Sequence, residues 1–129
     1  MATIAAPFGF RPVGLLGGGT WSDAIRHIKI ANNYGTAIFY GDVVKLVNTG
    51  TVEKDTGTTA MTPCGIFVGC RYTDPGSGQL TFNQFYPAST AADDVMAYVC
   101  DDPDVVFQAQ ADEAVAQTAL GNNVAVVQT

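Results

Sequence analysis

Residues 65–82 read GIFVGCRYTDPGSGQLTF and decide the fold class. Residues 65–73 are mostly β-branched, aromatic or small, which is typical of a buried strand. Residues 74–78, DPGSG, are a strong turn signal, because proline presets its φ angle and glycine accepts a positive one. Residues 79–82 then return as a second strand. This segment therefore predicts two strands joined by a tight turn.

Short apolar runs separated by turn residues continue on both sides of this hairpin. We expect further strands over residues 24–31, 36–40, 43–47, 51–54, 95–100, 105–110 and 123–128. Strands that recur about every 8–12 residues are typical of sandwiches and barrels. Helical patterning appears only near residues 113–120, where Asp112 can cap the start and Gly121 the end. The predicted fold class is all-β, a mainly antiparallel barrel or sandwich, with an extended N-terminal arm and one short helix.

Length and composition favour one folded domain. A chain of 129 residues and 13.5 kDa can bury roughly two thirds of its surface on folding. Hydrophobic residues make up 47% and charged residues only 14%, which excludes disorder and indicates a surface that a partner covers in large part. We divide the chain into an extended N-terminal arm, residues 1–20, and a single β-rich domain, residues 21–129.

Charge is unevenly distributed along the chain. Residues 1–71 hold all six basic and four acidic residues, whereas residues 72–129 hold eight acidic residues and no basic one. Nucleic-acid binding needs clustered cations that release counterions from phosphate, and this chain has no such cluster. No uncharged apolar run approaches the roughly 18 residues of a membrane span, and no secretory signal pattern is present. We therefore expect neither nucleic acid nor membrane as a partner.

The first twenty residues have the composition of an arm. Residues 5–13 read AAPFGFRPV, and the two prolines prevent a helix or a central strand. Residues 17–19 are all glycine and add flexibility. The apolar side chains in between are too many for a free tail. Two interpretations stay open: the arm docks its aromatic residues into a neighbouring subunit, or it folds back on its own domain.

The sequence offers no catalytic or metal-binding pattern. The sole histidine, His27, lies in a predicted strand, no serine stands in a nucleophile elbow, and no cysteine has zinc-ligand spacing. The serines and cysteines are Ser22, Ser77, Ser89, Cys64, Cys70 and Cys100. Residues 101–104, DDPD, lack the alternating ligands and central glycine of an EF-hand, so we expect a turn fixed by Pro103 and local N–H bonds. The expected protein is no enzyme, has no cofactor or metal, and keeps its thiols free as small buried side chains.

Four stretches of the chain resemble the small cement, or capsid decoration, proteins of tailed bacteriophages. They are residues 6–13 (APFGFRPV), 38–46 (IFYGDVVKL), 65–72 (GIFVGCRY) and 99–107 (VCDDPDVVF). In order and spacing these stretches cover most of the chain. They are structural motifs without chemistry, so the resemblance implies a fold and an assembly role and no reaction.

The resemblance implies a structural virion protein that is made in the bacterial host cytoplasm and sits on the outer capsid surface. Its partner is the major capsid protein, whose neighbouring subunits it cements so that the expanded head is stabilised. It is a homo-oligomer, for which a trimer is preferred and a dimer stays open. We expect the capsid contacts in the arm, with two aromatic anchors because buried aromatics dominate interface energetics. The expected contact residues are Pro7, Phe8, Phe10, Arg11, Pro12 and Val13.

The charge split then predicts an orientation. Residues 1–71, with the arm and Arg11, face the capsid shell, and the acidic residues 72–129 face solvent, where repulsion between particles limits their aggregation.

A rival interpretation is a β-domain exposed on a virion that recognises host-surface carbohydrate. The aromatic residues that form its sugar platform would be Trp21, Tyr34, Tyr40, Tyr72 and Tyr86. The same residues are also suited to a hydrophobic core.

The last residues raise a separate expectation. Residues 124–127, VAVV, are apolar and stand directly before the final residues of the sequence. Either this strand pairs at a sheet edge or the protein continues past Thr129, as cement proteins of this kind commonly do.

Overall fold

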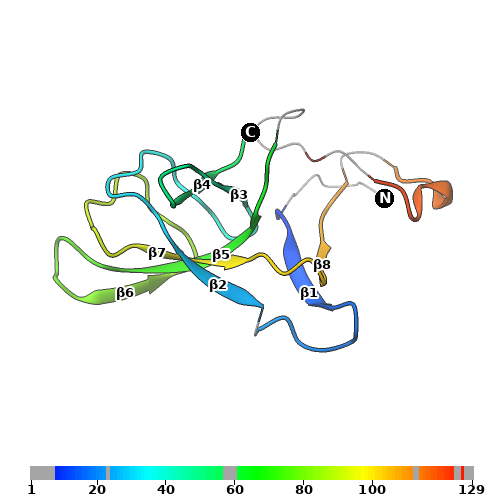
Figure 1. Ribbon diagram of the computed structural model, residues 1–129, viewed down its shortest axis with the longest axis horizontal. Helices are drawn as coiled ribbons and strands as arrows, with labels where there is room; N and C mark the ends of the chain where they lie inside the picture. Colours follow the sequence, from blue (N-terminus) through cyan, green and yellow to red (C-terminus); the bar gives the residue numbers. More distant parts are fainter. Residues whose placement is uncertain (1–7, 23, 57–60, 112–113, 124–125, 127–129) are drawn as a thin grey trace, which may run out of the picture.

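The computed structural model describes residues 8–22, 24–56, 61–111, 114–123 and 126 (Figure 1). Its elements are β1 (Arg11–Leu15), β2 (Ile25–Lys29), β3 (Val43–Leu46), β4 (Val52–Lys54), β5 (Gly65–Thr73), β6 (Leu80–Asn83), β7 (Met96–Cys100), β8 (Val105–Gln108) and a 3-10 turn, η1 (Gln117–Ala119). Every strand pairing is antiparallel, which confirms the mainly antiparallel all-β class. Whether the sheets form a barrel or a sandwich stays a prediction.

The hairpin that decided the fold class is present as expected. β5 spans the whole predicted strand and pairs with β6 from Cys70↔Asn83 to Thr73↔Leu80. In the turn, the Asp74 N–H donates to the Gln79 carbonyl at 2.8 Å, and the Asp74 carboxylate accepts the Gly76 N–H at 2.8 Å. An aspartate that bonds its own turn in this way fixes the register of the two strands.

β5 organises a six-stranded sheet in the order β2-β7-β5-β3-β4, with β6 also paired to β5. β7 runs along one edge of β5, and β3 and β6 share the other edge, one near each end. β1 and β8 form a separate two-stranded sheet, which lies beside the larger one in Figure 1. We call this pair of strands the ribbon.

The hydrophobic core lies against one face of β5 and β7. Phe67 and Val99 point into it and are fully buried. Loop residues cover them from the other side, among them the fully buried Ile38 and Tyr86, whose backbones pair as an isolated bridge. The opposite face of the same strands carries half-buried side chains such as Tyr98. One buried and one open face is the usual arrangement of an antiparallel sheet.

Two predicted elements were wrong. Residues 36–40 form no strand, only the Ile38↔Tyr86 bridge, because Gly41 turns the chain with a φ of 90°. The helix expected near residues 113–120 is reduced to η1, which has no side-chain cap and no buried residue. A helix this short is marginal in water unless one face packs against the domain.

The remaining C-terminal predictions fall largely outside the described part of the chain. Asp112, the expected helix cap, and most of the strand expected over residues 123–128 are not described, while Asn123 and Val126 lie in no strand. Across the described residues, no helical segment has the length and apolarity that a membrane crossing requires.

Candidate functional site on the β1–β8 ribbon

The ribbon joins the N-terminal arm to a strand from the other end of the chain. β1 and β8 pair from Arg11↔Gln108 to Leu15↔Val105, with an irregularity between Pro12 and Gly14. The sequence predicted that this segment forms no central strand. β1 agrees with that prediction, because it lies at a sheet edge, where a proline is tolerated. The described part of the arm therefore pairs with its own chain through β1, and docking of its aromatic residues into a neighbouring subunit stays a prediction.

The ribbon is attached to the large sheet by a close crossing of two backbones. The Phe10 N–H donates to the Gly41 carbonyl at 2.9 Å, and the Gly41 N–H donates to the Phe67 carbonyl in β5, also at 2.9 Å. A Cβ atom on Gly9 would lie 2.7 Å from the Gly41 carbonyl oxygen. Glycine is required on both sides of this crossing because any side chain would force the backbones apart.

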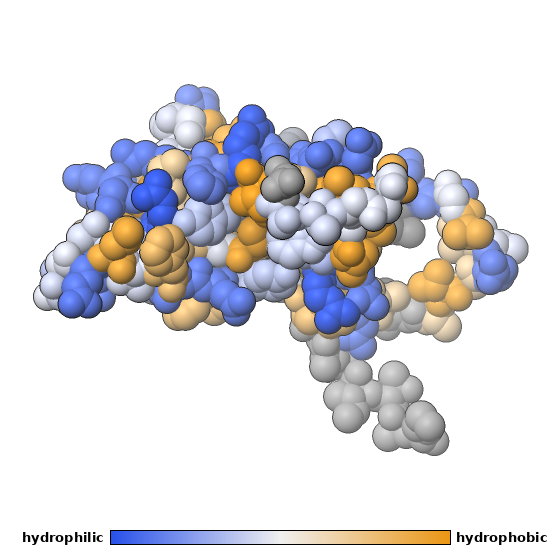
Figure 2. All heavy atoms as spheres, turned by 90° about the horizontal axis from the view of Figure 1, so that it is seen from below, coloured by the Kyte–Doolittle hydropathy of each residue, from blue (hydrophilic) through white to orange (hydrophobic). Residues whose placement is uncertain are grey.

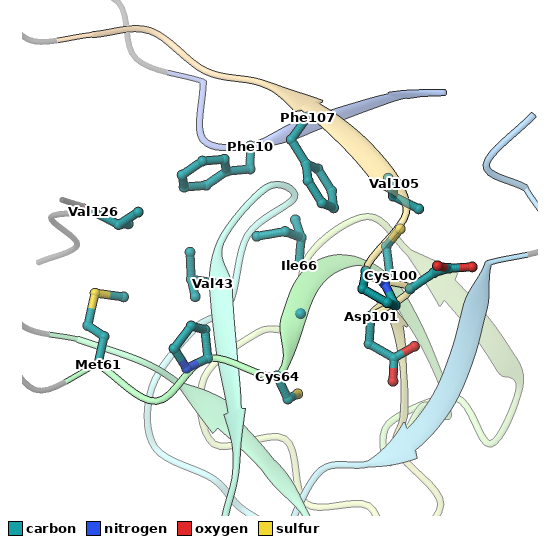
Figure 3. Close-up of a pocket in the computed structure, with 14 residues that line it drawn as sticks. Phe10, Val43, Met61, Cys64, Ile66, Cys100, Asp101, Val105, Phe107 and Val126 are labelled. Carbon is teal, nitrogen blue, oxygen red and sulfur yellow. The ribbon is translucent and has the colours of Figure 1, made fainter. Parts of the chain in front are cut away.

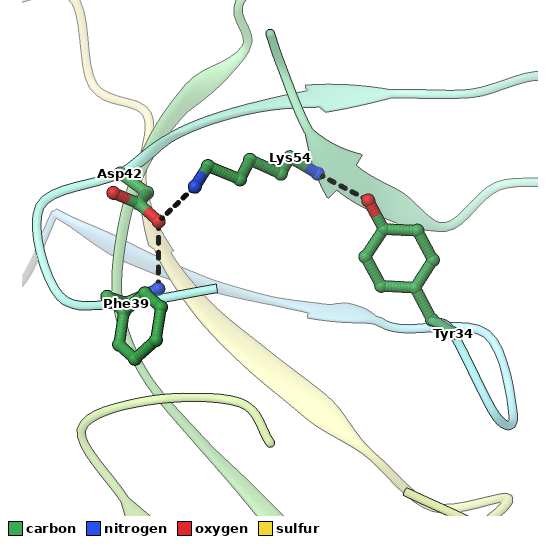
Figure 4. A network of polar contacts seen from close by, with 4 residues as sticks. All are labelled: Tyr34, Phe39, Asp42 and Lys54. Carbon is green, nitrogen blue, oxygen red and sulfur yellow. Dashed lines mark hydrogen bonds and ion pairs between the residues drawn. The ribbon is translucent and has the colours of Figure 1, made fainter. Parts of the chain in front are cut away.

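The loop that carries Gly41 is itself held by polar contacts (Figure 4). The Asp42 carboxylate accepts the Phe39 N–H at 2.9 Å and lies 3.4 Å from the Lys54 ammonium. The Lys54 N–H in turn donates to the Tyr34 hydroxyl at 3.1 Å. These contacts connect the loop to β4 and so fix the point at which the arm crosses it.

Two phenylalanines pack the inner side of the ribbon. Phe10 and Phe107 meet edge to face with centroids 6.3 Å apart. Figure 3 shows both rings over an open groove of about 620 Å³, which Val43, Ile66 and Val105 also line. Edge-to-face pairs add roughly 0.5–1.5 kcal/mol to the burial of their area. The contact between Phe10 and Phe107 therefore ties the start of β1 to β8 on the inner side of the ribbon.

The outer side of the ribbon exposes apolar surface beside one cation. Phe8 is 43% exposed and Val13 53% exposed. The Arg11 guanidinium lies 5.2 Å from the centroid of the Phe8 ring and donates a hydrogen bond to the Gln108 side-chain carbonyl. Leu16, after β1, and Val106, in β8, are also exposed. The outer side thus combines aliphatic, aromatic and cationic groups.

The expected contact residues divide between the two sides. Phe8, Arg11 and Val13 are exposed, whereas Phe10 is half-buried over the groove and Pro12 is buried. Pro7 lies outside the described residues. The sequence did not single out Val106, although the period of two in β8 places it opposite in direction to the inward-facing Val105 and Phe107.

Apolar side chains are also exposed elsewhere, and Figure 2 shows them as separate patches among hydrophilic residues. Leu80 and Phe82 on β6 are 55% and 64% exposed, and Phe39 stacks on Phe85 at 5.9 Å with both rings partly exposed. What distinguishes the ribbon is that its exposed residues lie on a narrow element with few contacts to the rest of the domain.

The three thiols are free, as expected. Cys70 and Cys100 are buried and Cys64 is half-buried. Burial raises the pKa of the Cys70 thiol to about 11, and burial is also the main reason why the pKa values of Cys64 and Cys100 are raised. Thiols protonated in this way are poor nucleophiles.

The acidic residues of the second half bond to nearby backbone and side chains. The Asp102 carboxylate accepts the Asp104 N–H at 2.8 Å, which confirms the turn predicted for residues 101–104. Asp101 forms an ion pair with Arg26 of β2. Asp94 accepts hydrogen bonds from the hydroxyl and the N–H of Thr73, and these lower its pKa below the ordinary value. These acids therefore stabilise turns and strand ends.

The aromatic residues of the rival interpretation do not share one surface. Tyr72 and Tyr86 are buried in the core, and Tyr34 packs against it with its ring 6.0 Å from that of Tyr86. Of these five residues, only Trp21 and Tyr40 line a common groove, which is the second groove of the structure. The five-residue platform is therefore not formed.

Comparison of the chain with protein-family models, curated proteins and solved structures found no match. Functional assignment therefore depends on the residues and contacts described above.

Proposed function

We propose that this chain is a capsid cement protein of a tailed bacteriophage, which binds the outer surface of the expanded head and joins neighbouring major capsid protein subunits. The proposal includes the virion location, a homo-oligomer with a trimer preferred over a dimer, an extended arm over residues 1–20, and a barrel or sandwich for residues 21–129. The observation that carries it is the ribbon, because it presents exposed apolar and cationic side chains of the arm on an element anchored at both ends.

Composition and chemistry also support an assembly role. A charged fraction of 14% suits a protein whose surface is covered by partners, since interface cores are depleted in charged residues. Weak contacts from one ribbon gain avidity when several linked copies bind one particle. Burial raises the pKa of all three thiols and so disfavours the reactive thiolate form, which gives no support to nucleophilic chemistry.

The contact surface proposed for the ribbon is its outer side, formed by Phe8, Arg11 and Val13 together with Leu16 and Val106. This selection refines the expected contacts: Pro12 is buried, and Phe10 is turned away from the outer side and packs on Phe107 over the first groove. Removing residues 2–16 would therefore be a poor test, because it also removes β1 and the partner strand of β8.

Point substitutions on the outer side give a sharper test. A Phe8→Ala, Val13→Ser and Leu16→Ser variant should remain folded, because these side chains are exposed. It should bind purified expanded heads that lack the protein at least about tenfold more weakly in co-sedimentation, because truncating an interface anchor removes about 2 kcal/mol. The control is Leu80→Ser, an exposed apolar residue of β6, the strand at the other end of the molecule in Figure 1. Equal binding by the triple variant and the control would remove the ribbon from the contact.

A further inference from the structure

A second groove lies on the open face of the large sheet and shares no lining residue with the first. It has a volume of about 520 Å³. Its lining includes the rings of Trp21, Tyr40 and Tyr98, together with the polar side chains of His27 and Gln84. All three aromatic residues are half-buried, so each ring is supported by the protein and still accessible to a ligand.

The sheet register brings these side chains together. His27 of β2 lies opposite Tyr98 of β7, and their ring centroids are 4.5 Å apart. On its other side Tyr98 pairs with Gly69 of β5, which has no side chain to cover the ring. Directly paired residues lie on the same face of a sheet, so His27 and Tyr98 form the middle of the groove.

Loops supply the walls of the groove. Trp21 stands before β2, where its carbonyl accepts the Ala24 N–H at 2.9 Å. Tyr40 directly precedes Gly41, whose N–H is bonded to β5. Gln84 directly follows β6. Rings from three separate chain segments therefore face one open space.

The core does not account for these aromatic residues. It lies on the opposite face of β7, where Ala97 and Val99 are buried. Among the described residues, the hydroxyls of Tyr40 and Tyr98 have no hydrogen-bond partner, so both are available to a ligand. A site lined by aromatic rings with a few convergent polar groups has the usual composition of a small-molecule pocket.

We propose that this groove is a saccharide-binding site that takes pyranose rings. The face of a pyranose ring carries aliphatic C–H groups, which pack on the electron-rich faces of indole and phenol rings. Its hydroxyl edge both donates and accepts, as do the Gln84 amide and the tyrosine hydroxyls. This site is separate from the proposed capsid contact and does not depend on it.

The single tryptophan of the chain makes binding directly measurable. Because Trp21 lines the groove, its fluorescence should change saturably on titration with a tetrasaccharide that binds. The probes are maltotetraose, cellotetraose, chitotetraose, mannotetraose and a hyaluronan tetrasaccharide, preceded by a glycan array. The array uses the whole 129-residue chain.

Two variants separate stacking from folding. Tyr98→Ala should weaken binding by about tenfold or more, whereas Tyr98→Phe should retain most of the affinity because it keeps the ring. The matched control is Phe82→Ala, an exposed ring on the same sheet that does not line the groove. Circular dichroism of each variant checks the fold.

Three results would overturn the proposal. They are no binding to any glycan on the array, saccharide binding that Tyr98→Ala leaves unchanged, and binding of a proline-rich peptide without any saccharide. A proline-rich peptide is included because aromatic grooves also bind polyproline segments. Loss of head binding in the ribbon variant has no bearing on any of these outcomes.

Discussion

Gly41 lies where the arm crosses the loop before β3, and its backbone leaves no room there for a side chain. Its φ is 90°, and a Cβ atom there would lie 2.9 Å from the Phe8 carbonyl oxygen and 3.1 Å from the Phe10 nitrogen. Both neighbours are backbone atoms, so no side-chain rotation relieves the clash. The positive φ alone costs a non-glycine residue roughly 1–2 kcal/mol.

Gly41→Ala should therefore lower the free energy of unfolding by more than about 1 kcal/mol, measured by chemical denaturation. Gly35→Ala is the matched control, since a Cβ atom there meets open space and its φ is not in the left-handed region. At such a site alanine stabilises by about 0.4–1 kcal/mol through the unfolded chain. Equal stability of the two variants would show that the crossing is not tight.

A second prediction for a single residue concerns Asp94 and the dependence of the protein's stability on pH. Hydrogen bonds from Thr73 hold the pKa of Asp94 below that of the unfolded chain. The stabilisation is therefore complete above the unfolded pKa, near 4, and is lost as pH falls through the folded pKa. The difference in melting temperature between the wild type and Asp94→Asn should be largest at neutral pH and shrink below about pH 4. A Thr73→Val variant, which keeps the N–H bond, should lie between them. A pH-independent difference would contradict this origin.

At the scale of elements, the strands followed from sequence more reliably than the rest. Alternating apolar residues and strong turn residues located β2 to β8 to within a few residues, because the side-chain period of a strand is written directly in the sequence. The segment before Gly41 and the C-terminal helix were wrong for a different reason. Gly41 turns the chain directly after the first segment, and the described residues of the second have no buried side chain in η1. A local pattern of apolar residues reveals neither of these facts.

The sequence predicted which residue types form the candidate site, but not which way their side chains point. A regular strand would place Phe8 and Phe10 on the same side, and both were expected to be anchors. Gly9, with a φ of 76°, interrupts that alternation. Phe8 is consequently exposed while Phe10 covers the groove. The second groove was out of reach for a different reason, since Tyr98 joins Trp21 and Tyr40 only through the strand order.

The prediction for the scale of elements concerns the local stability of the ribbon. Phe107→Ala should loosen it, because the ring packs on Phe10 over the groove. Hydrogen exchange should accelerate in Arg11–Leu15 and Val105–Gln108 while the central strand Gly65–Thr73 stays protected. Val106→Ala, at the neighbouring outward position, is the control and should leave exchange unchanged. Uniform acceleration across both sheets would mean that the ribbon and the large sheet unfold as one unit.

At the scale of the whole molecule, the two oppositely charged halves of the sequence interleave. β7, from the acidic half, lies between β2 and β5 of the basic half, and Arg26 pairs with Asp101 across them. The turn that holds Asp104 lies at the base of the ribbon, where the Leu16 N–H donates to the Asp104 carbonyl at 2.9 Å. The predicted orientation of the protein on the head, with its acidic residues facing solvent, therefore applies best to the β5–β6 turn, which contains Asp74.

This arrangement predicts different effects for two charge changes. Arg11→Glu on the ribbon should weaken co-sedimentation with expanded heads and reduce its sensitivity to salt, because a screened attraction is lost. Asp74→Asn, at the far end of the sheet, should leave head binding as it is and serves as the control. If Asp74→Asn weakened binding as much as Arg11→Glu, the proposed orientation of the protein on the head would be wrong.

The way the ribbon is fastened has a mechanical consequence. The β8 strand of the ribbon is continuous with β7 through residues 101–104. At the start of β1, Phe10 is hydrogen-bonded to Gly41, and Gly41 is hydrogen-bonded to Phe67 of β5. A pull on the arm is therefore carried into the strand at the centre of the sheet. The ribbon therefore cannot leave the large sheet on this side without breaking the Phe10–Gly41 hydrogen bond.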